Sequence, residues 1–520
     1  MNNDFKSILD EYSRGTDFKA SIGTKGLFEQ AKINERFFIG DQWYGARCGN
    51  DRPLVRHNVI KRIGNYKMSQ ILSSNPSVSF SAEGIPTTEK SYENILLNAP
   101  DDKEINFIMS AFESYYNTTA ERVKLYELNE RILKKAYISG TAVLYTYWDP
   151  SVKTGLFADE NKTVEIKGDI ACEVLDIEDI VFGDPYCENI EQQPFIILKS
   201  YKNTDEVLHE ARLFGADLAR LELIQKSAEN GKVAVYSKLY KEYKSGHEYT
   251  IKCIKVCERA VVRESFDTEL SRYPLALFTW ERKNNLIYGE SEVTYLIPNQ
   301  IAINRMITAN VWATMTNGMP IMLVNGDAVN GKISNEPGQI IKVYGSNEDV
   351  AGAIKYVTPA TFSEDFDKTV NYLIENTLTQ SGANEVALGD SRADNAAALS
   401  IMREAALVPL QIIRNRFFAF CEDTARIWAD FWINYYGERS FKLKDKGSVK
   451  YIAFNGERYK SLVINVKIDI ATDISYSEKE KTEMLLTLFD KGIINKEQLL
   501  SRLPSGIIPD IKSLLEEGEV

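Results

Sequence analysis

The chain has 520 residues, of which 44% are hydrophobic and 26% are charged, and its formal net charge is -12. This composition is ordinary for a globular protein, and the length allows two or three packed domains. The acidic balance argues against a protein whose main task is to grip free nucleic acid or an anionic membrane, because like charges repel at long range. If DNA is a partner, we expect its contact to be loose, transient or local.

The N-terminal stretch, residues 1–15, carries early acidic residues and no apolar run, so we predict no signal peptide. The sequence has no stretch of about 18 apolar residues, so we predict no membrane span. We expect a cytoplasm-like compartment. Six scattered cysteines and three histidines offer little material for a metal or histidine site, and we expect structural cysteines. Cys253 and Cys257 lie four apart in a predicted strand, so they should face the same side of a sheet.

The first 75 residues are predicted to be helical, with a break at Gly40 and a second helix that ends before Pro76. Residues 103–139 form a long amphipathic pattern, which predicts one helix. From residue 141 to 202 the pattern alternates and is β-branched, which indicates strands. A short helix is expected near 204–228, followed by strands at 232–263 and 273–281.

Helix returns from Gly289, and residues 319–358 are β-like with Gly, Asn and Pro turns. A second helix is predicted at 363–380, then a polar loop rich in Gly, Ser and Asp. A very long helix should run from about Asn395 to Tyr436, with a kink at Pro409 because proline removes a hydrogen bond. A strand and short helices end the chain. The order is mixed, so we predict an α+β fold.

Residues 325–334, NGDAVNGKIS, approach a phosphate-binding loop, with Gly326, four residues, and then Gly331-Lys332. Such a loop also needs a Ser or Thr hydroxyl for magnesium and a helix that starts at the phosphate. Ile333 follows the lysine, and the next residues contain Pro337 and Gly338, so a helix cannot continue. We therefore interpret this stretch as a hairpin with Asn-Gly turns and expect no nucleotide cofactor.

Four stretches in sequence order together resemble tailed-bacteriophage portal proteins, the head-to-tail connectors. They are FFIGDQW (37–43) with RHNVIKRIGNYKMSQILSSNPSVSF (56–80), FGDPYCENIEQQPFII (182–197), YGESEVTYLIPNQIAINRMITANVWATMTNGMP (288–320) and GDSRADNAAALSIMREAALVPLQIIRNRFF (389–418). The resemblance covers about residues 30 to 475. It implies a ring, commonly of twelve subunits, at one capsid vertex.

In that family, DNA is pumped through the ring by the terminase and leaves through it, and the tail attaches to it. The implied partners are double-stranded DNA held transiently, the terminase large subunit, a head-tail adaptor, and capsid and scaffolding proteins. The implied location is the virion, after assembly in the host cytoplasm. The resemblance implies no enzymatic activity, no cofactor and no metal.

By order along the chain, the resemblance assigns eight regions. They are a wing (1–288), a stem helix (289–318), a β-rich clip (319–360), a second stem helix (361–381), a tunnel loop (382–395), a long kinked helix (396–437), wing return strands (438–475) and a short helical crown (476–520).

The resemblance also implies site residues. The DNA-facing tunnel loop would present Asn384, Glu385, Gly389, Asp390, Ser391, Arg392 and Asp394, with Gly382 adding mobility. The channel-lining stem would present Glu364, Asp365, Asp367, Lys368 and Glu375. The clip would present Asn330, Lys332 and Glu336 to the terminase or adaptor.

Each of these assignments has a structural alternative. An acidic lining would repel DNA and ease sliding, since each neutralised phosphate adds affinity, but the stem charges are equally consistent with a solvated helix face. Asp394 or Asn395 would also serve as a helix cap. The aromatics at 417, 418, 428, 431, 432, 435 and 436 are expected to be mostly core, with some packing on a neighbouring subunit. Trp43 is expected to be core.

Two other functions stay open. One is another virion component, such as an adaptor or coat protein. The other is a metal-dependent hydrolase, which needs clustered carboxylates or histidines. The acidic pairs Asp365/Asp367 and Asp469/Asp473 exist, but no partner histidine or lysine constellation is visible in the sequence.

Overall fold

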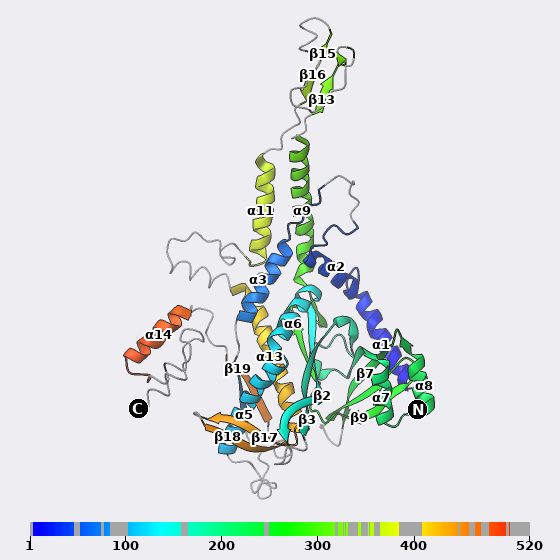
Figure 1. The fold of residues 1–520 in the computed structure, drawn as a ribbon, viewed down its shortest axis with the longest axis vertical. Coiled ribbons are helices and arrows are strands. Elements are labelled where there is room, and N and C mark those ends of the chain that lie inside the picture. Colours follow the sequence, from blue (N-terminus) through cyan, green and yellow to red (C-terminus); the bar gives the residue numbers. More distant parts are fainter. Residues whose placement is uncertain are drawn as a thin grey trace. The chain divides into compact units, whose positions relative to one another are not determined.

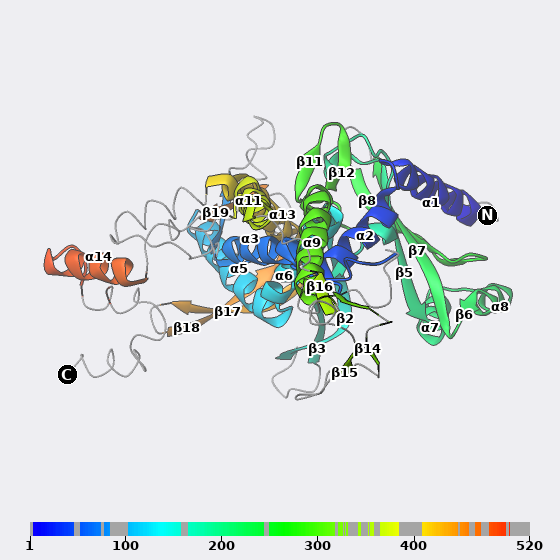
Figure 2. The same ribbon diagram turned by 90° about the horizontal axis from the view of Figure 1, so that it is seen from above.

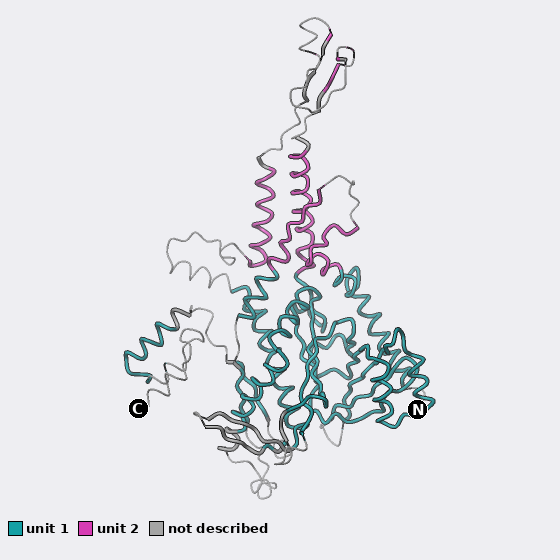
Figure 3. The backbone as a smooth tube through the Cα atoms, in the orientation of Figure 1, with its two compact units in different colours: residues 1–32, 64–292, 386–520 teal, residues 33–63, 293–385 magenta. Residues whose placement is uncertain are grey.

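The structure is a computed structural model of the chain. Apart from single positions, it describes residues 4–45, 53–73, 77–83, 102–157, 165–243, 249–317, 364–383, 408–445, 448–456, 463–469 and 478–495, with short pieces of 321–357. The chain forms two compact units (Figure 3): unit 1 comprises residues 1–32, 64–292 and 386–520, and unit 2 comprises residues 33–63 and 293–385. Helices and antiparallel sheets occur together, which is the mixture that the sequence predicts.

Two antiparallel sheets organise the first part of unit 1 (Figure 1). The larger sheet has the order β4-β5-β7-β8-β9, with β6 also paired to β7. Its strands are β4 (Ile180–Phe182), β5 (Phe195–Asn203), β6 (Ala228–Glu229), β7 (Lys232–Tyr243), β8 (Tyr249–Val256) and β9 (Val261–Asp267). The smaller sheet has the order β10-β2-β3, with β10 (Leu275–Thr279), β2 (Thr141–Phe157) and β3 (Glu165–Leu175).

One apolar core joins these two sheets. Val143 and Leu275 of the smaller sheet pack in the same cluster as Ile196 and Leu239 of the larger one. The next residue of β5, Ile197, belongs to a different cluster on the opposite face of the larger sheet. This alternation is the period of two that the sequence displays.

Helix α1 (Asp4–Ser21) covers that opposite face (Figure 2), where Ile8 is buried against the sheet. Lys19 of α1 is completely buried. Its amino group donates to the backbone oxygens of Ile177, Glu178 and Ile180 at 2.8, 3.1 and 2.9 Å, and it lies 4.7 Å from the centre of the Phe28 ring. A single lysine therefore fixes α1 to the chain around β4, a contact that the helical pattern of α1 does not predict.

The other end of the larger sheet is covered by α7 (Thr204–Leu213) and α8 (Leu218–Lys226). Val207, Ile224 and Cys257 share one buried cluster there. Cys253 belongs instead to the core between the two sheets, and strand β8 ends at Val256, before Cys257. The two cysteines predicted to face the same side thus support two separate clusters.

The second core of unit 1 is aromatic and is built on α13 (Gln411–Tyr435). The Trp432 ring lies 5.3 Å from that of Phe112, and the Trp428 ring lies 5.1 Å from that of Tyr116. Of the seven predicted core aromatics, Phe417, Phe418, Trp428, Phe431, Trp432 and Tyr436 are buried, and Tyr435 is half-buried.

The elements around this second core come from distant parts of the chain. They are α5 (Asp102–Arg122), α6 (Leu125–Ser139), the paired strands β1 (Ser77–Glu83) and β19 (Val463–Asp469), and the hairpin β17 (Glu438–Asp445) with β18 (Ser448–Asn455). Unit 1 also contains β11 (Glu281–Lys283) paired with β12 (Leu286–Glu290), and α14 (Glu478–Asp490).

Three helix boundaries differ from the predictions. The predicted helix 103–139 is divided between α5 and α6, because Lys124 adopts a left-handed backbone with φ of 54°. The first helical stretch is divided between α1 and α2 (Leu27–Ile39), with Gly23 and Gly26 at positive φ. Pro409 lies in a short 3-10 turn, Val408–Leu410, directly before α13. Residues 384–407 of the predicted long helix and tunnel loop lie outside the described residues.

None of the described helices combines the length and the hydropathy that a membrane crossing requires.

We expect Lys19→Met to lower the free energy of unfolding by about 2 kcal/mol or more, because three buried carbonyl groups lose their donor. Urea unfolding at fixed pH measures the difference. Lys6→Met, on the exposed face of the same helix, is the control and should change stability by less than about 0.5 kcal/mol. Equal stability of the Lys19→Met variant and the wild type would contradict the role of Lys19.

The same pair of proteins tests a pH effect. Burial lowers the pKa of Lys19 from 10.5 to about 7, although Asp179 and Glu178 act in the opposite direction. Between these two pKa values the unfolded chain holds a proton that the folded chain does not, so folding is favoured as the pH rises. The stability difference between wild type and Lys19→Met should therefore grow from pH 7 to pH 10. A difference that stays constant or shrinks would contradict the lowered pKa.

Candidate functional site

Two antiparallel helices of unit 2 carry a β-ribbon between them. Helix α9 (Glu292–Asn317) and helix α11 (Glu364–Gln380) lie side by side (Figures 1 and 2). Asn299 donates to the hydroxyl of Thr377 at 3.1 Å, and Asn310 donates to the carboxylate of Asp367 at 2.7 Å. From the first bond to the second, the number rises by eleven on α9 and falls by ten on α11, as an antiparallel pair requires.

The ribbon follows α9 directly along the chain. Strand β13 (Ile321–Val324) pairs with β16 (Ile354–Val357), and β14 (Val329–Asn330) pairs with β15 (Lys342–Val343). Two strands without a third are marginally stable in water. Asn330 pairs with Lys342, so β14 and β15 are antiparallel. The predicted turn at Asn330-Gly331 lies outside the described residues and stays a prediction. Gly331, Lys332 and Glu336 lie outside the described residues.

A row of polar side chains on α9, two of them buried, binds the extended segment 53–58. Gln300 and Asn304 are 1% and 2% exposed, and with Thr308 they are spaced four residues apart on one face of the helix. Thr308 accepts a hydrogen bond from the backbone N–H of Val55 at 3.1 Å, and Asn304 accepts one from that of His57 at 3.0 Å. The row therefore pairs the backbone of a segment that has no strand partner.

Gln300 makes the largest number of these contacts. Its carbonyl oxygen accepts from the backbone N–H groups of Val59 and Ile60 at 2.9 and 3.3 Å, at the start of α3 (Val59–Ser73). Its amide nitrogen donates to the backbone oxygen of His57 at 2.6 Å and to Asn304 at 3.0 Å. One glutamine thus caps the first turn of a helix 240 residues away in sequence.

The motif FFIGDQW continues the same network. Asn304 donates to the side-chain oxygen of Gln42 at 2.6 Å, and Gln42 donates to the backbone oxygen of Phe37 at 3.0 Å. The indole of Trp43 donates to the backbone oxygen of Val55 at 3.0 Å. Trp43, predicted as core, is half-buried and helps to hold the extended segment. The stretches 37–43 and 56–60 therefore meet on α9, a convergence that we did not predict.

The beginning of α9 is held by a buried ion pair within unit 1. The carboxylate of Glu292 accepts from Lys67 at 2.6 Å and from the indole of Trp280 at 3.0 Å. The side chains of Lys67 and Glu292 are only 8% and 14% exposed. An acidic residue in the first turn of a helix also interacts favourably with the helix dipole. The first residue of α9 is thus fixed by two buried partners.

Close packing fixes the same region. Gly140 ends α6 at φ of +88°, and a Cβ atom there would lie 2.5 Å from the backbone oxygen of Gly289. A Cβ atom on Gly289 would lie 2.2 Å from a methyl carbon of Thr279. Both positions therefore require glycine where the end of α6 meets β12, three residues before α9 begins.

The charges predicted to line a channel lie on α11, as expected from the sequence. Lys368 and Glu375 are exposed. Asp367 is also exposed, but its carboxylate accepts a hydrogen bond from Asn310 and so joins the two helices. Glu364 and Asp365 lie in the first turn of α11. The direction that this face takes in an assembly stays a prediction.

The structure describes few of the other predicted site residues. Asn330 lies in β14. The residues predicted for the tunnel loop lie outside the described part of the chain: Asn384, Glu385, Gly389, Asp390, Ser391, Arg392 and Asp394. Whether these residues lie close together therefore stays a prediction.

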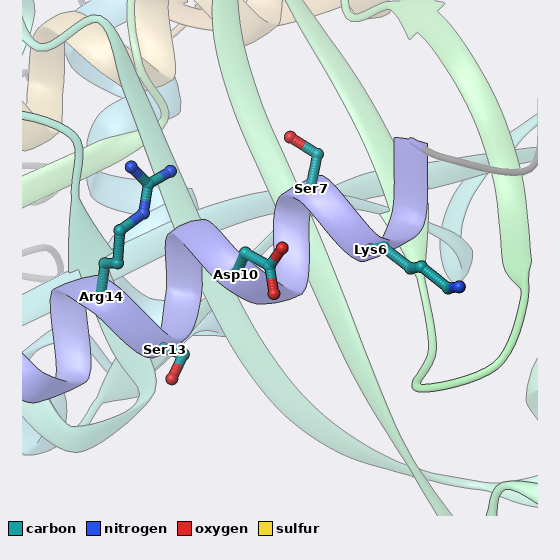
Figure 4. Close-up of a pocket in the computed structure, with 5 residues that line it drawn as sticks. All are labelled: Lys6, Ser7, Asp10, Ser13 and Arg14. Atoms are coloured by element: carbon teal, nitrogen blue, oxygen red, sulfur yellow. The ribbon is translucent and has the colours of Figure 1, made fainter.

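A shallow hollow on the outer side of α1 is lined by Lys6, Ser7, Asp10, Ser13 and Arg14 (Figure 4). All five belong to one exposed helix face, and basic and acidic side chains alternate along it. That arrangement is typical of a solvated helix surface. Within the described residues, no group of three or more His, Cys, Asp or Glu side chains is placed to hold a metal ion.

The chain matches none of the protein-family models and none of the curated proteins with which it was compared.

We expect Gln300→Ala to be among the most destabilising single changes in unit 2, by about 2–4 kcal/mol, because it leaves several buried backbone groups unpaired. Gln380→Ala, at an exposed position of α11, is the matched control. Hydrogen exchange measures the effect locally: the amides of Val59 and Ile60 should exchange faster in Gln300→Ala. Unchanged protection at both amides would show that the row does not hold α3.

Proposed function

We propose that this chain is a portal protein, the subunit of a ring at one capsid vertex. In this proposal the ring is the channel through which the terminase packages double-stranded DNA and through which the DNA leaves. It is also the attachment point of the tail, through a head-tail adaptor. The chain performs no catalysis, and capsid and scaffolding proteins are its further partners during assembly in the host cytoplasm.

The observation that supports this proposal most strongly is that apolar side chains are accessible on the second half of α9. The whole helix of 26 residues has only two charged residues, Glu292 and Arg305. From Arg305 to Met315 none of its side chains is buried, and Met315 is 52% exposed. Accessible apolar side chains that gather on one element mark an interaction surface.

The apolar residues of this half surround the helix. At about 100° per residue, Met306, Ile307, Val311 and Met315 point in different directions. Helix α11 and the segment 53–58 each cover part of this surface, through Asn310 and Thr308. Further copies of the chain on both sides of the helix pair, as in a ring of heterologous contacts, would cover the rest.

The remaining support comes from the order of elements. A helix, a β-ribbon and a second helix follow each other in unit 2, as the resemblance implies for stem, clip and stem. In its described residues the ribbon has two strands in each part, so a partner that packs on it would stabilise it. Its proposed partners are the terminase and later the adaptor. The acidic residues of α11 would keep contact with DNA weak, because unneutralised phosphates repel them.

Electron microscopy of the purified full-length protein tests the proposal. We expect rings with a central hole wide enough for duplex DNA, and their symmetry gives the subunit number. If only monomers appear, the protein is next mixed with the coat and scaffolding proteins, and rings should form in that mixture. Closed particles without a hole would contradict a portal and favour an adaptor, a coat protein or an enzyme.

A variant connects the ring to α9. We expect Met315→Glu to raise the protein concentration needed for assembly by tenfold or more, since a charge without a partner would be buried at each contact between subunits. Its thermal unfolding as a monomer should match that of the wild type, because the side chain is exposed in the single chain. Thr379→Glu, at an exposed position of α11, is the control. Unchanged assembly of Met315→Glu would exclude this part of α9 from the interface.

A further inference from the structure

The guanidinium group of Arg263, on β9 of unit 1, is held between two aromatic rings. Its central carbon lies 3.6 Å from the ring centre of Phe214 and 3.3 Å from that of Phe266. Both distances are within the range of a cation–π contact. Stacking of this kind fixes the orientation of an arginine without using its hydrogen-bond donors.

Among the described residues, the guanidinium group of Arg263 has neither a hydrogen bond nor an ion pair. The neighbouring acids are already engaged. Glu210 pairs with Lys255 at 2.5 Å, and Glu264 pairs with Arg220 at 2.9 Å. Partial burial lowers the pKa of Arg263, although Glu210 acts in the opposite direction. The cation is therefore partly desolvated, and the nearby carboxylate offsets only part of the cost of that desolvation.

The turn that carries Phe214 also has exposed apolar side chains. The turn between α7 and α8 presents Leu213, Phe214 and Leu218, which are 67%, 46% and 81% exposed. Three large apolar side chains within six residues are more than the scattered single ones that are normal on a surface. Arginine is one of the residue types enriched in protein-binding hot spots, and exposed apolar side chains that gather on one turn mark an interaction surface.

We propose that Arg263 and the α7–α8 turn bind an acidic peptide segment of another protein, whose carboxylate pairs with the guanidinium edge and whose leucine-type side chains cover Leu213, Phe214 and Leu218. A carboxylate fits because its two oxygens match two parallel N–H donors. The apolar surroundings favour a peptide over a nucleic acid, whose backbone would place further charges against Leu213 and Leu218. The site lies wholly in unit 1 and does not depend on the proposed ring.

Fluorescence anisotropy of the full-length protein tests the site. The probe is a labelled peptide, Leu-Leu-Glu-Glu-Leu with blocked termini, and its partner is the same peptide with glutamine in place of both glutamates. We expect the glutamine peptide to bind at least about tenfold more weakly, because it cannot form the charge-assisted hydrogen bonds of a carboxylate. Equal binding of both peptides, or no binding of either up to millimolar concentration, would overturn the proposal.

Variants locate the binding. Arg263→Gln should weaken the acidic peptide at least about tenfold, and Arg263→Lys should restore little, since a lysine lacks the planar fork. Arg259→Gln, at an exposed position near the start of β9, is the control and should bind normally. If Arg263→Gln does not fold, Leu218→Ser takes its place and should weaken both peptides. Full binding by these variants, or displacement of the peptide by duplex DNA at equal charge concentration, would overturn the proposal.

Discussion

The backbone of the extended segment 53–58 finds its partners on side chains of α9, and the organisation of unit 2 depends on that pairing. A buried backbone N–H without a partner costs about as much as a lost hydrogen bond. Gln300 and Asn304 remove this cost for a segment that belongs to no sheet. They also bring the start of α3 and the motif around Gln42 to the same helix.

Helix α9 therefore has two different halves. Its first half is fixed by buried partners, beginning with the ion pair of Glu292 and Lys67 and continuing with the polar row. Its second half has apolar side chains and no buried one up to Met315. The proposed assembly needs this combination, because a surface that packs against copies of itself must be rigid before it is covered.

The sequence predicts much of the secondary structure, because its signals are local. The periods of two and of 3.6 residues are present in β5 and α13, and Gly40 marks the end of α2 through its positive φ. The division between α5 and α6 was not predicted, because neither Val123 nor Lys124 is a residue that ends helices by itself. The burial of Lys19 was not predicted either, since its three acceptors lie about 160 residues away.

The candidate site was less predictable than the fold. Polar residues four apart in an otherwise apolar helix, Gln300, Asn304 and Thr308, are a signal for a buried partner, but the sequence does not say which segment they bind. The predicted channel residues rest on a resemblance, and local chemistry alone does not orient Lys368 or Glu375. The proposed peptide site depends on Arg263 and on the rings of Phe214 and Phe266. These two rings are far apart in sequence, and only the fold brings both to Arg263.

The polar row on α9 is made of amides, a hydroxyl and backbone groups, and none of these groups gains or loses a proton in the ordinary range of pH. Dissolved ions screen charges but act only weakly on such neutral hydrogen bonds. The joint between α9 and the segment 53–60 should therefore keep one geometry in dilute buffer, in concentrated salt and at mildly acidic pH. Ionic conditions would then alter what α9 and α11 bind without altering how α9 holds the segment 53–60.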